Sequence, residues 1–229
     1  MSTQIEQLNE GNDQEKEFID TSKKRPKMKN PNKSLIFISI FTSLLSIYLI
    51  YKLYSLKNVS NFMKLCESRF SVREYSQKTV EQEKIEKLLR VAQLSPTAAN
   101  KQPQKIYIIT KEEDKKKLTT VTKYTFNAPL FFIVCTDKNI AWKHRTEDVY
   151  STEIDGSIVS TNILLEAHDI GLGSVYVRSF QTEKLKQLFN IPENMVPVAI
   201  LPIGYPKEGT KPSESHFKRK DIKEMVEYL

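Results

Sequence analysis

The chain has 229 residues, of which 39% are hydrophobic and 10% aromatic, and its formal net charge is +7. This length and composition allow one domain with a packed core plus appendages, and they exclude wholesale disorder. Cys66 and Cys135 lie far apart and form no CxxC pair, which argues against a disulfide framework or a zinc site. No histidine pattern indicates a catalytic metal. No basic helix with interleaved aromatic residues is present, so we expect no nucleic-acid partner.

The N-terminal part of the chain is expected to form a disordered polar tail, residues 1–33, followed by a transmembrane helix, residues 34–54. Residues 34–51 read SLIFISIFTSLLSIYLIY, eighteen residues without a charge. As a helix this run is about 27 Å long, close to the roughly 30 Å hydrocarbon core of a bilayer. A core helix is rarely apolar on every side, and no small-residue cleavage site marks a signal peptide. We therefore expect a single-pass membrane protein.

Residues 55–229 are expected to form one α+β domain. Apolar residues recur at helical spacing in one set of segments, and short β-branched and aromatic runs indicate strands in another. The expected helices cover 79–94, 152–170 and 183–191, and the expected strands cover 105–110, 130–136, 174–180 and 196–206.

The second of these helices carries two end signals. Thr152 and Asp155 have the spacing of a capping box at its start. Gly171 and Gly173 are expected to supply the left-handed conformation that ends it. The GLGS run is no dinucleotide fingerprint, because the third glycine is missing and the glycines follow a helix instead of a strand.

Cationic and amide side chains in the loops outline a binding site for a phosphorylated ring. In RFSVREY two arginines flank a serine, and each charge-assisted hydrogen bond to a phosphate contributes about 1.5–3 kcal/mol. Amide side chains suit a heterocycle with N–H and C=O edges. Taken singly, each residue also fits an ordinary surface or capping role. The residues concerned are Arg69, Ser71, Arg73, Asn100, Gln102, Lys218 and Arg219.

Six blocks in a fixed order resemble the nitroreductase family of flavin mononucleotide (FMN) enzymes. ESRFSVREYSQKTV resembles the family's opening motif, and LLRVAQLSPTAANKQPQKIYII resembles its second. The blocks FNAPLFFIVC, EIDGSIVSTNILLEAHDIGLGSVYV, VPVAILPIGYP and KRKDIKEMV follow, so the resemblance covers residues 61–229. It implies an α/β/α sandwich around a mostly antiparallel sheet. It also implies an intertwined homodimer with FMN at the subunit interface.

The resemblance also implies roles for individual residues. The first motif and the C-terminal arginine would hold the phosphate and ribityl group, and the second motif and one strand would reach the isoalloxazine ring. The implied FMN contacts are Arg69, Phe70, Ser71, Val72, Arg73, Pro96, Thr97, Asn100, Tyr176, Val177, Arg178 and Arg219. Phe70 replaces a common arginine, Thr97 a common serine, and Gln104 the usual tryptophan. Because Gln104 stands in place of the tryptophan, the resemblance does not define the shape of the substrate pocket.

The implied function is an FMN-dependent oxidoreductase with a ping-pong mechanism. NADH or NADPH would reduce the flavin, and a small acceptor such as a nitroaromatic or a quinone would then reoxidise it. No acid–base pair is required, because the flavin carries the chemistry. The alternatives are a membrane-anchored reductive dehalogenase of the iodotyrosine deiodinase type and a non-catalytic flavin-binding membrane protein. The basic residues before the span favour a domain on the far side. The supply of reduced nicotinamide favours the cytosol, which we expect.

Overall fold

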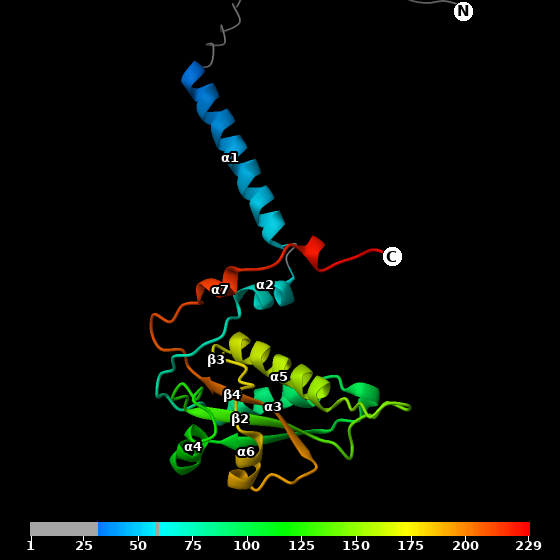
Figure 1. The fold of residues 1–229 in the computed structure, drawn as a ribbon. Coiled ribbons are helices and arrows are strands. Elements are labelled where there is room, and N and C mark those ends of the chain that lie inside the picture. Colours follow the sequence, from blue (N-terminus) through cyan, green and yellow to red (C-terminus); the bar gives the residue numbers. More distant parts are fainter. Residues whose placement is uncertain (1–31, 58–59) are drawn as a thin grey trace, which may run out of the picture. The chain divides into compact units, whose positions relative to one another are not determined.

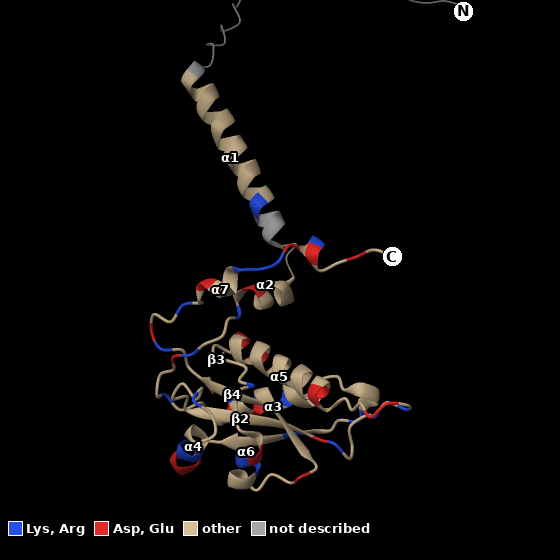
Figure 2. Cartoon of the chain, viewed as in Figure 1, with Lys and Arg blue, Asp and Glu red and all other residues tan. Residues whose placement is uncertain are grey.

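The computed structural model describes residues 32–57 and 60–229. The chain divides into two compact units, Met1–Asn58 and Val59–Leu229. Nearly all of the tail predicted for residues 1–33 lies outside the described residues. The first unit contains helix α1, Lys33–Lys57. Its stretch Ser34–Lys52 is long and apolar enough to cross a membrane, as a signal sequence would also be, and none of it is buried. In Figure 2, charge colouring on α1 appears only near its C-terminal end.

A four-stranded antiparallel sheet forms the centre of the second unit. Its strand order is β1-β2-β4-β3. The central pair β2 and β4 shares the longest ladder, in which Phe132 faces Leu201. A bulge between Val134 and Cys135 shifts the register of that ladder. The strands are β1 Gln104–Ile109, β2 Leu130–Asp137, β3 Gly173–Ser174 and β4 Met195–Gly204.

Helices cover both faces of this sheet, which gives three layers. Helices α3 and α5 lie on one face, and α4 and α6 lie on the other (Figure 1). The predicted α+β fold with an antiparallel sheet is therefore confirmed. The helices are α2 Asn61–Ser68, α3 Gln82–Leu94, α4 Glu112–Thr119, α5 Thr152–Asp169, α6 Thr182–Phe189 and α7 Glu214–Phe217, with short 3₁₀ turns at Ala98–Asn100 and Ile222–Glu224.

The alternation of side chains along β2 divides the core into two halves. Phe132 and Val134 pack into the cluster under α3 and α5. Phe131 and Ile133 point the other way, into the cluster that contains Leu118 of α4 and Leu185 of α6. Because successive side chains of a strand point to opposite faces, an unbroken apolar run such as LFFIVC serves both halves. Burying each large side chain contributes about 1.5–3 kcal/mol, so the sheet is a firm support for the loops.

The start of α5 differs from the predicted capping box. The helix begins at Thr152, but Asp155 does not cap it. The Asp155 carboxylate accepts hydrogen bonds from Ser151 Oγ at 2.6 Å and from the backbone N–H of Ala98 at 2.9 Å. The capping-box prediction is therefore wrong, because a partner 57 residues away takes the carboxylate.

The end of α5 agrees with the prediction at only one of its two glycines. Gly171 has φ +78°, the left-handed conformation that ends a helix. Gly173 has no positive φ, and a Cβ there would lie 2.7 Å from Val72 Cβ. A glycine is needed here because the Val72 side chain occupies the space that a Cβ would take. The strand predicted for residues 174–180 is also much shorter than expected, because only Ser174 belongs to β3 and Val177 makes an isolated bridge to Ile200.

Candidate functional site

The segment RFSVREY is fixed by its backbone to the edge of the sheet. Ser71 forms a parallel bridge with Ser174, and Val72 N–H donates to Ser174 O at 3.1 Å. The buried Tyr75 hydroxyl lies 2.7 Å from Val72 O and 3.1 Å from Pro202 O, where it acts as donor. Burial raises the pKa of Tyr75 well above its usual range, so the hydroxyl stays protonated. With Val72 turned into the core, the neighbouring side chains are left on the outer side.

These outer side chains line a strongly basic cavity of about 210 Å³. Its remaining wall comes from the C-terminal segment, so the first and last motifs of the sequence meet in one chain. None of its three arginines is ion-paired with a carboxylate in the described part of the chain, and no carboxylate lines the cavity. The lining residues are Arg69, Phe70, Ser71, Arg73, Ser213, Ser215, His216 and Arg219.

Two histidines flank Phe70 beside this cavity. The ring of Phe70 meets His168 and His216 edge-on, with centroid distances of 6.4 and 6.3 Å. His216 Nε2 lies 3.2 Å from Glu67 O, which ties the C-terminal segment to α2. Burial lowers the pKa of His168, and the Arg69 guanidinium lowers it further. Concentrated positive charge and hydroxyl donors without a counter-charge suit an anion such as a phosphate.

A second cavity of about 230 Å³ adjoins the first, because Arg73 lines both. Two aromatic side chains, Tyr124 and Phe126, form one part of its wall, and residues 175–179 form the other. It therefore offers flat apolar surfaces beside a basic cavity. Sequence reasoning missed Tyr124 and Phe126, although both stand directly before the buried strand β2.

Residues 175–179 alternate in their backbone contacts. The N–H of Val175 donates to Pro202 O at 3.4 Å, and the N–H of Val177 donates to Ile200 O at 3.0 Å. The amides of Tyr176 and Arg178 face away from β4, since alternate residues of an extended segment point in opposite directions. The Tyr176 hydroxyl lies 3.2 Å from Ser157 Oγ. The Arg178 guanidinium forms an exposed ion pair with Glu153 at 2.9 Å and lies over the Phe180 ring.

The second motif does not join these two cavities within one chain. Pro96, Thr97 and Asn100 are absent from the residues that line them. Their loop contains left-handed residues other than glycine, including Ala99 at φ +49° and Asn100 at φ +53°. Such conformations cost free energy and persist only where the surroundings enforce them. Here the Asp155 carboxylate, through Ala98 N–H, holds the loop.

Comparison with known proteins agrees with this geometry. Residues 66–125 and 123–205 match the sequence model of the nitroreductase family. A Methanothermobacter thermautotrophicus protein named NADH dehydrogenase/NAD(P)H nitroreductase is 32% identical over 155 residues, which cover 64% of this chain and 78% of that protein. A Bacillus subtilis protein named FMN reductase is 25% identical over 157 residues, or 60% of this chain and 63% of its own.

A solved structure extends the agreement to the fold. The crystal structure of a nitroreductase family protein from Clostridium difficile 630 has a TM-score of 0.69 and is 36% identical. The match covers 74% of this chain and 98% of that one. The family resemblance predicted from the six sequence blocks is thus confirmed. This chain belongs to the nitroreductase family and is an NAD(P)H oxidoreductase of that family.

Proposed function

We propose that the protein is an FMN-dependent oxidoreductase that takes hydride from NADH or NADPH and reduces a small acceptor of the nitroaromatic or quinone type. The observation that carries the proposal is the position of Arg73, which lines both the basic cavity and the aromatic one. A ligand that fits both must join a phosphate to a flat ring, as FMN does. The residues present fit that group, since guanidinium and hydroxyl donors stand at one end and aromatic side chains at the other.

At the phosphate end, Arg69, Arg73 and Arg219 would supply the positive charge and Ser71 a hydroxyl. Arg219 reaches this cavity from the same chain, with its Nη1 donating to Lys218 O at 2.9 Å. Phe70 would pack beside the ribityl group. Val72 is 2% exposed, so its contribution would be to hold the backbone of the first motif against β3.

At the ring end, residues 176–178 would orient the isoalloxazine. Val177 is committed to β4, which leaves the amides of Tyr176 and Arg178 as donors for a ring heteroatom. The Glu153 carboxylate would hold Arg178 against that edge through their ion pair. The bound flavin accepts hydride and passes on electrons. The second, aromatic cavity is called the ring cavity below. The residues that line it include no Asp, Glu or His, so their part is to bind and orient the flavin ring.

The site would be completed by a second copy of the chain. Pro96, Thr97 and Asn100 lie outside both cavities of their own chain, and two large apolar side chains near them are exposed: Leu94 at 62% and Ile154 at 61%. A homodimer would cover such surface and would bring the second motif of one subunit to the flavin of the other. The size of the purified holoenzyme in solution tests this arrangement.

Helix α1 would anchor the protein in a membrane with the domain in the cytosol. The stretch Ser34–Lys52 is unburied and carries no charge before Lys52, which fits an anchor. The expected result is that the full chain stays with the membrane fraction in alkaline carbonate and is released by detergent. Release by carbonate alone, or an N-terminus cleaved after the helix, would contradict the anchor.

Flavin content tests the proposed function directly. The purified protein is expected to contain FMN, to be bleached by NADH or NADPH, and to regain its colour on addition of a nitroaromatic or quinone. Loss of one charge-assisted hydrogen bond weakens binding by about tenfold or more. Arg219→Ala, which alters the basic cavity but not the aromatic one, should therefore lose FMN affinity by that factor while its affinity for riboflavin, which has no phosphate, changes little. Arg145 lines neither cavity, so Arg145→Ala is the matched control.

A colourless protein that cannot be reconstituted with flavin would refute the proposal. An unchanged FMN affinity in Arg219→Ala would remove this residue from the phosphate site. The acceptor screen should include iodotyrosine, because rapid deiodination would replace the proposed acceptor class by a halogenated one.

A further inference from the structure

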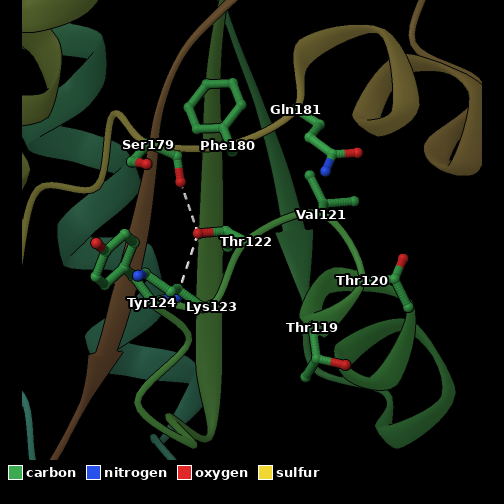
Figure 3. Close-up of a pocket in the computed structure, with 9 residues that line it drawn as sticks. All are labelled: Thr119, Thr120, Val121, Thr122, Lys123, Tyr124, Ser179, Phe180 and Gln181. Carbon is green, nitrogen blue, oxygen red and sulfur yellow. Dashed lines mark hydrogen bonds between the residues drawn. The ribbon is translucent and has the colours of Figure 1, made fainter.

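A third cavity lies next to the ring cavity and has a larger volume, about 390 Å³. Tyr124 and Ser179 line both cavities, so the two are adjacent. Figure 3 shows the wall of the third cavity, which consists of two facing segments, residues 119–124 from the last residue of α4 onward and residues 179–181 before α6. The basic, aromatic and third cavities thus follow one another, with Arg73 shared at one junction and Tyr124 and Ser179 at the next.

The two segments of the third cavity are joined by hydrogen bonds that fix its shape. Thr122 Oγ1 donates to Ser179 O at 2.7 Å (Figure 3). The N–H of Gln181 also donates to Val121 O, at 3.1 Å. Lys184 Nζ also donates to Thr120 O, at 2.8 Å, which brings a second ammonium close to this wall. The cavity is therefore supported from both sides and does not depend on one loose loop.

The chemistry of the third cavity favours a polar anionic ligand. Lys123, Ser179 and Gln181 offer an ammonium, a hydroxyl and an amide, and their side chains make no hydrogen bond or ion pair within residues 60–229. Lys123 Nζ lies over the Tyr124 ring, 5.2 Å from its centroid. No Asp or Glu lines the cavity. Donors without a counter-charge beside two aromatic faces suit a phosphate group and the sugar or base next to it.

We propose that the third cavity binds the diphosphate and adjoining ribose of the nicotinamide coenzyme. This inference rests on the proposed function. Hydride transfer requires the nicotinamide to lie against the flavin ring, so the rest of the dinucleotide must extend over a surface that borders the ring cavity. The chain has no glycine-rich dinucleotide fingerprint to receive the diphosphate. The third cavity borders the ring cavity and offers free donors without a carboxylate.

Steady-state kinetics of the full-length holoenzyme with two kinds of hydride donor test this inference. NADPH and NADH carry the diphosphate, whereas dihydronicotinamide riboside has the same reacting ring without any phosphate. Lys123→Gln is expected to raise the KM for NADPH and NADH about tenfold, the effect of one charge-assisted hydrogen bond. The KM for the riboside and for the acceptor should stay unchanged. Lys111→Gln, which does not line the cavity, is the matched control.

Equal changes of KM for the dinucleotides and for the riboside, or no change for either kind of donor, would overturn the inference. A change confined to the acceptor would also overturn it and would make the cavity an acceptor site. Flavin content, measured before the assay, reports separately on the proposed function. Calorimetric titration with ADP-ribose needs no turnover: Lys123→Gln should bind it about tenfold more weakly than the unmodified protein. Equal binding of ADP-ribose by both proteins would contradict the proposal even if the enzyme were inactive.

Discussion

Replacing Asp155 by alanine is expected to destabilise the domain and to release the second-motif loop. The carboxylate is 1% exposed and accepts two hydrogen bonds, from Ser151 Oγ at 2.6 Å and from Ala98 N–H at 2.9 Å. Asp155→Ala leaves both donors without an acceptor. Each hydrogen bond to a charged group contributes about 1.5–3 kcal/mol. Part of this loss is offset, because the alanine variant avoids the free-energy cost of removing the Asp155 charge from water.

The net loss expected for Asp155→Ala is about 3 kcal/mol of unfolding free energy. For a domain of this size, each kcal/mol corresponds to about 2–4 °C in Tm, so the variant should unfold about 6–12 °C lower. Asp155→Asn keeps an acceptor for Ala98 N–H and should lose about half as much. Thermal unfolding of the detergent-solubilised full chain measures both changes, and Asp169→Ala, at an exposed position, is the control.

A Tm of Asp155→Ala within about 2 °C of the unmodified protein would refute this reasoning, since it would mean that the two hydrogen bonds contribute less than 1 kcal/mol. Equal losses in Asp155→Ala and Asp155→Asn would show that the charge matters and the acceptor geometry does not. FMN affinity is an independent readout. It should fall in Asp155→Ala if the loop it holds contacts the flavin.

Three further substitutions or modifications probe other parts of the domain. Gly173→Ala should cost about 1–3 kcal/mol in urea unfolding, because its Cβ would lie 2.7 Å from Val72 Cβ; a neutral effect would show that the first motif can shift freely. Iodoacetamide should label the exposed Cys66 and spare Cys135, whose pKa burial raises to about 12; mass spectrometry showing Cys135 labelled in the folded protein would contradict its burial. Burial lowers the pKa of His168, so the unfolded chain takes up this proton first as pH falls. The stability that depends on neutral His168 is present above the unfolded pKa of about 6.5, and it is lost as pH falls through the lower pKa of the folded state. His168→Gln should therefore flatten the decline of unfolding free energy between pH 7.5 and 5, and an unchanged slope would count against it.

The buried elements could be predicted from the sequence because their residue patterns alone indicate them. The strand expected at 130–136 is β2, Leu130–Asp137, and the helix expected at 152–170 is α5, Thr152–Asp169. A continuous apolar run of strand length and a long segment with apolar residues at helical spacing have few alternative structures. The two arginines of the first motif and Arg219 also line one cavity. The chemistry of these loop residues predicted an anion site, and the family resemblance added FMN as its ligand.

Other features could not be predicted because tertiary contacts decide them. Residues 174–180 have strong strand propensity, yet only Ser174 is in a strand, since ladder pairing depends on the neighbouring chain. The role of Asp155 depends on Ala98, a partner that no local spacing reveals. Phe126 enters the ring cavity from a loop with φ +52°, a conformation that its sequence does not indicate. Helix α4, Glu112–Thr119, was overlooked although acids precede lysines along it.

The cluster of Arg69, Arg73 and Arg219 also has a consequence for the lifetime of the protein. These guanidiniums line one cavity without a carboxylate, so they repel one another until an anion enters. The repulsion acts between the first motif and the C-terminal segment, which meet there. A bound dianion would therefore offset this repulsion and stabilise the contact by mass action. Without such an anion this contact would be weaker, and the C-terminal segment would be more open to proteolysis, as chain ends generally are. Cofactor supply would in this way set how much of the protein persists in the cell.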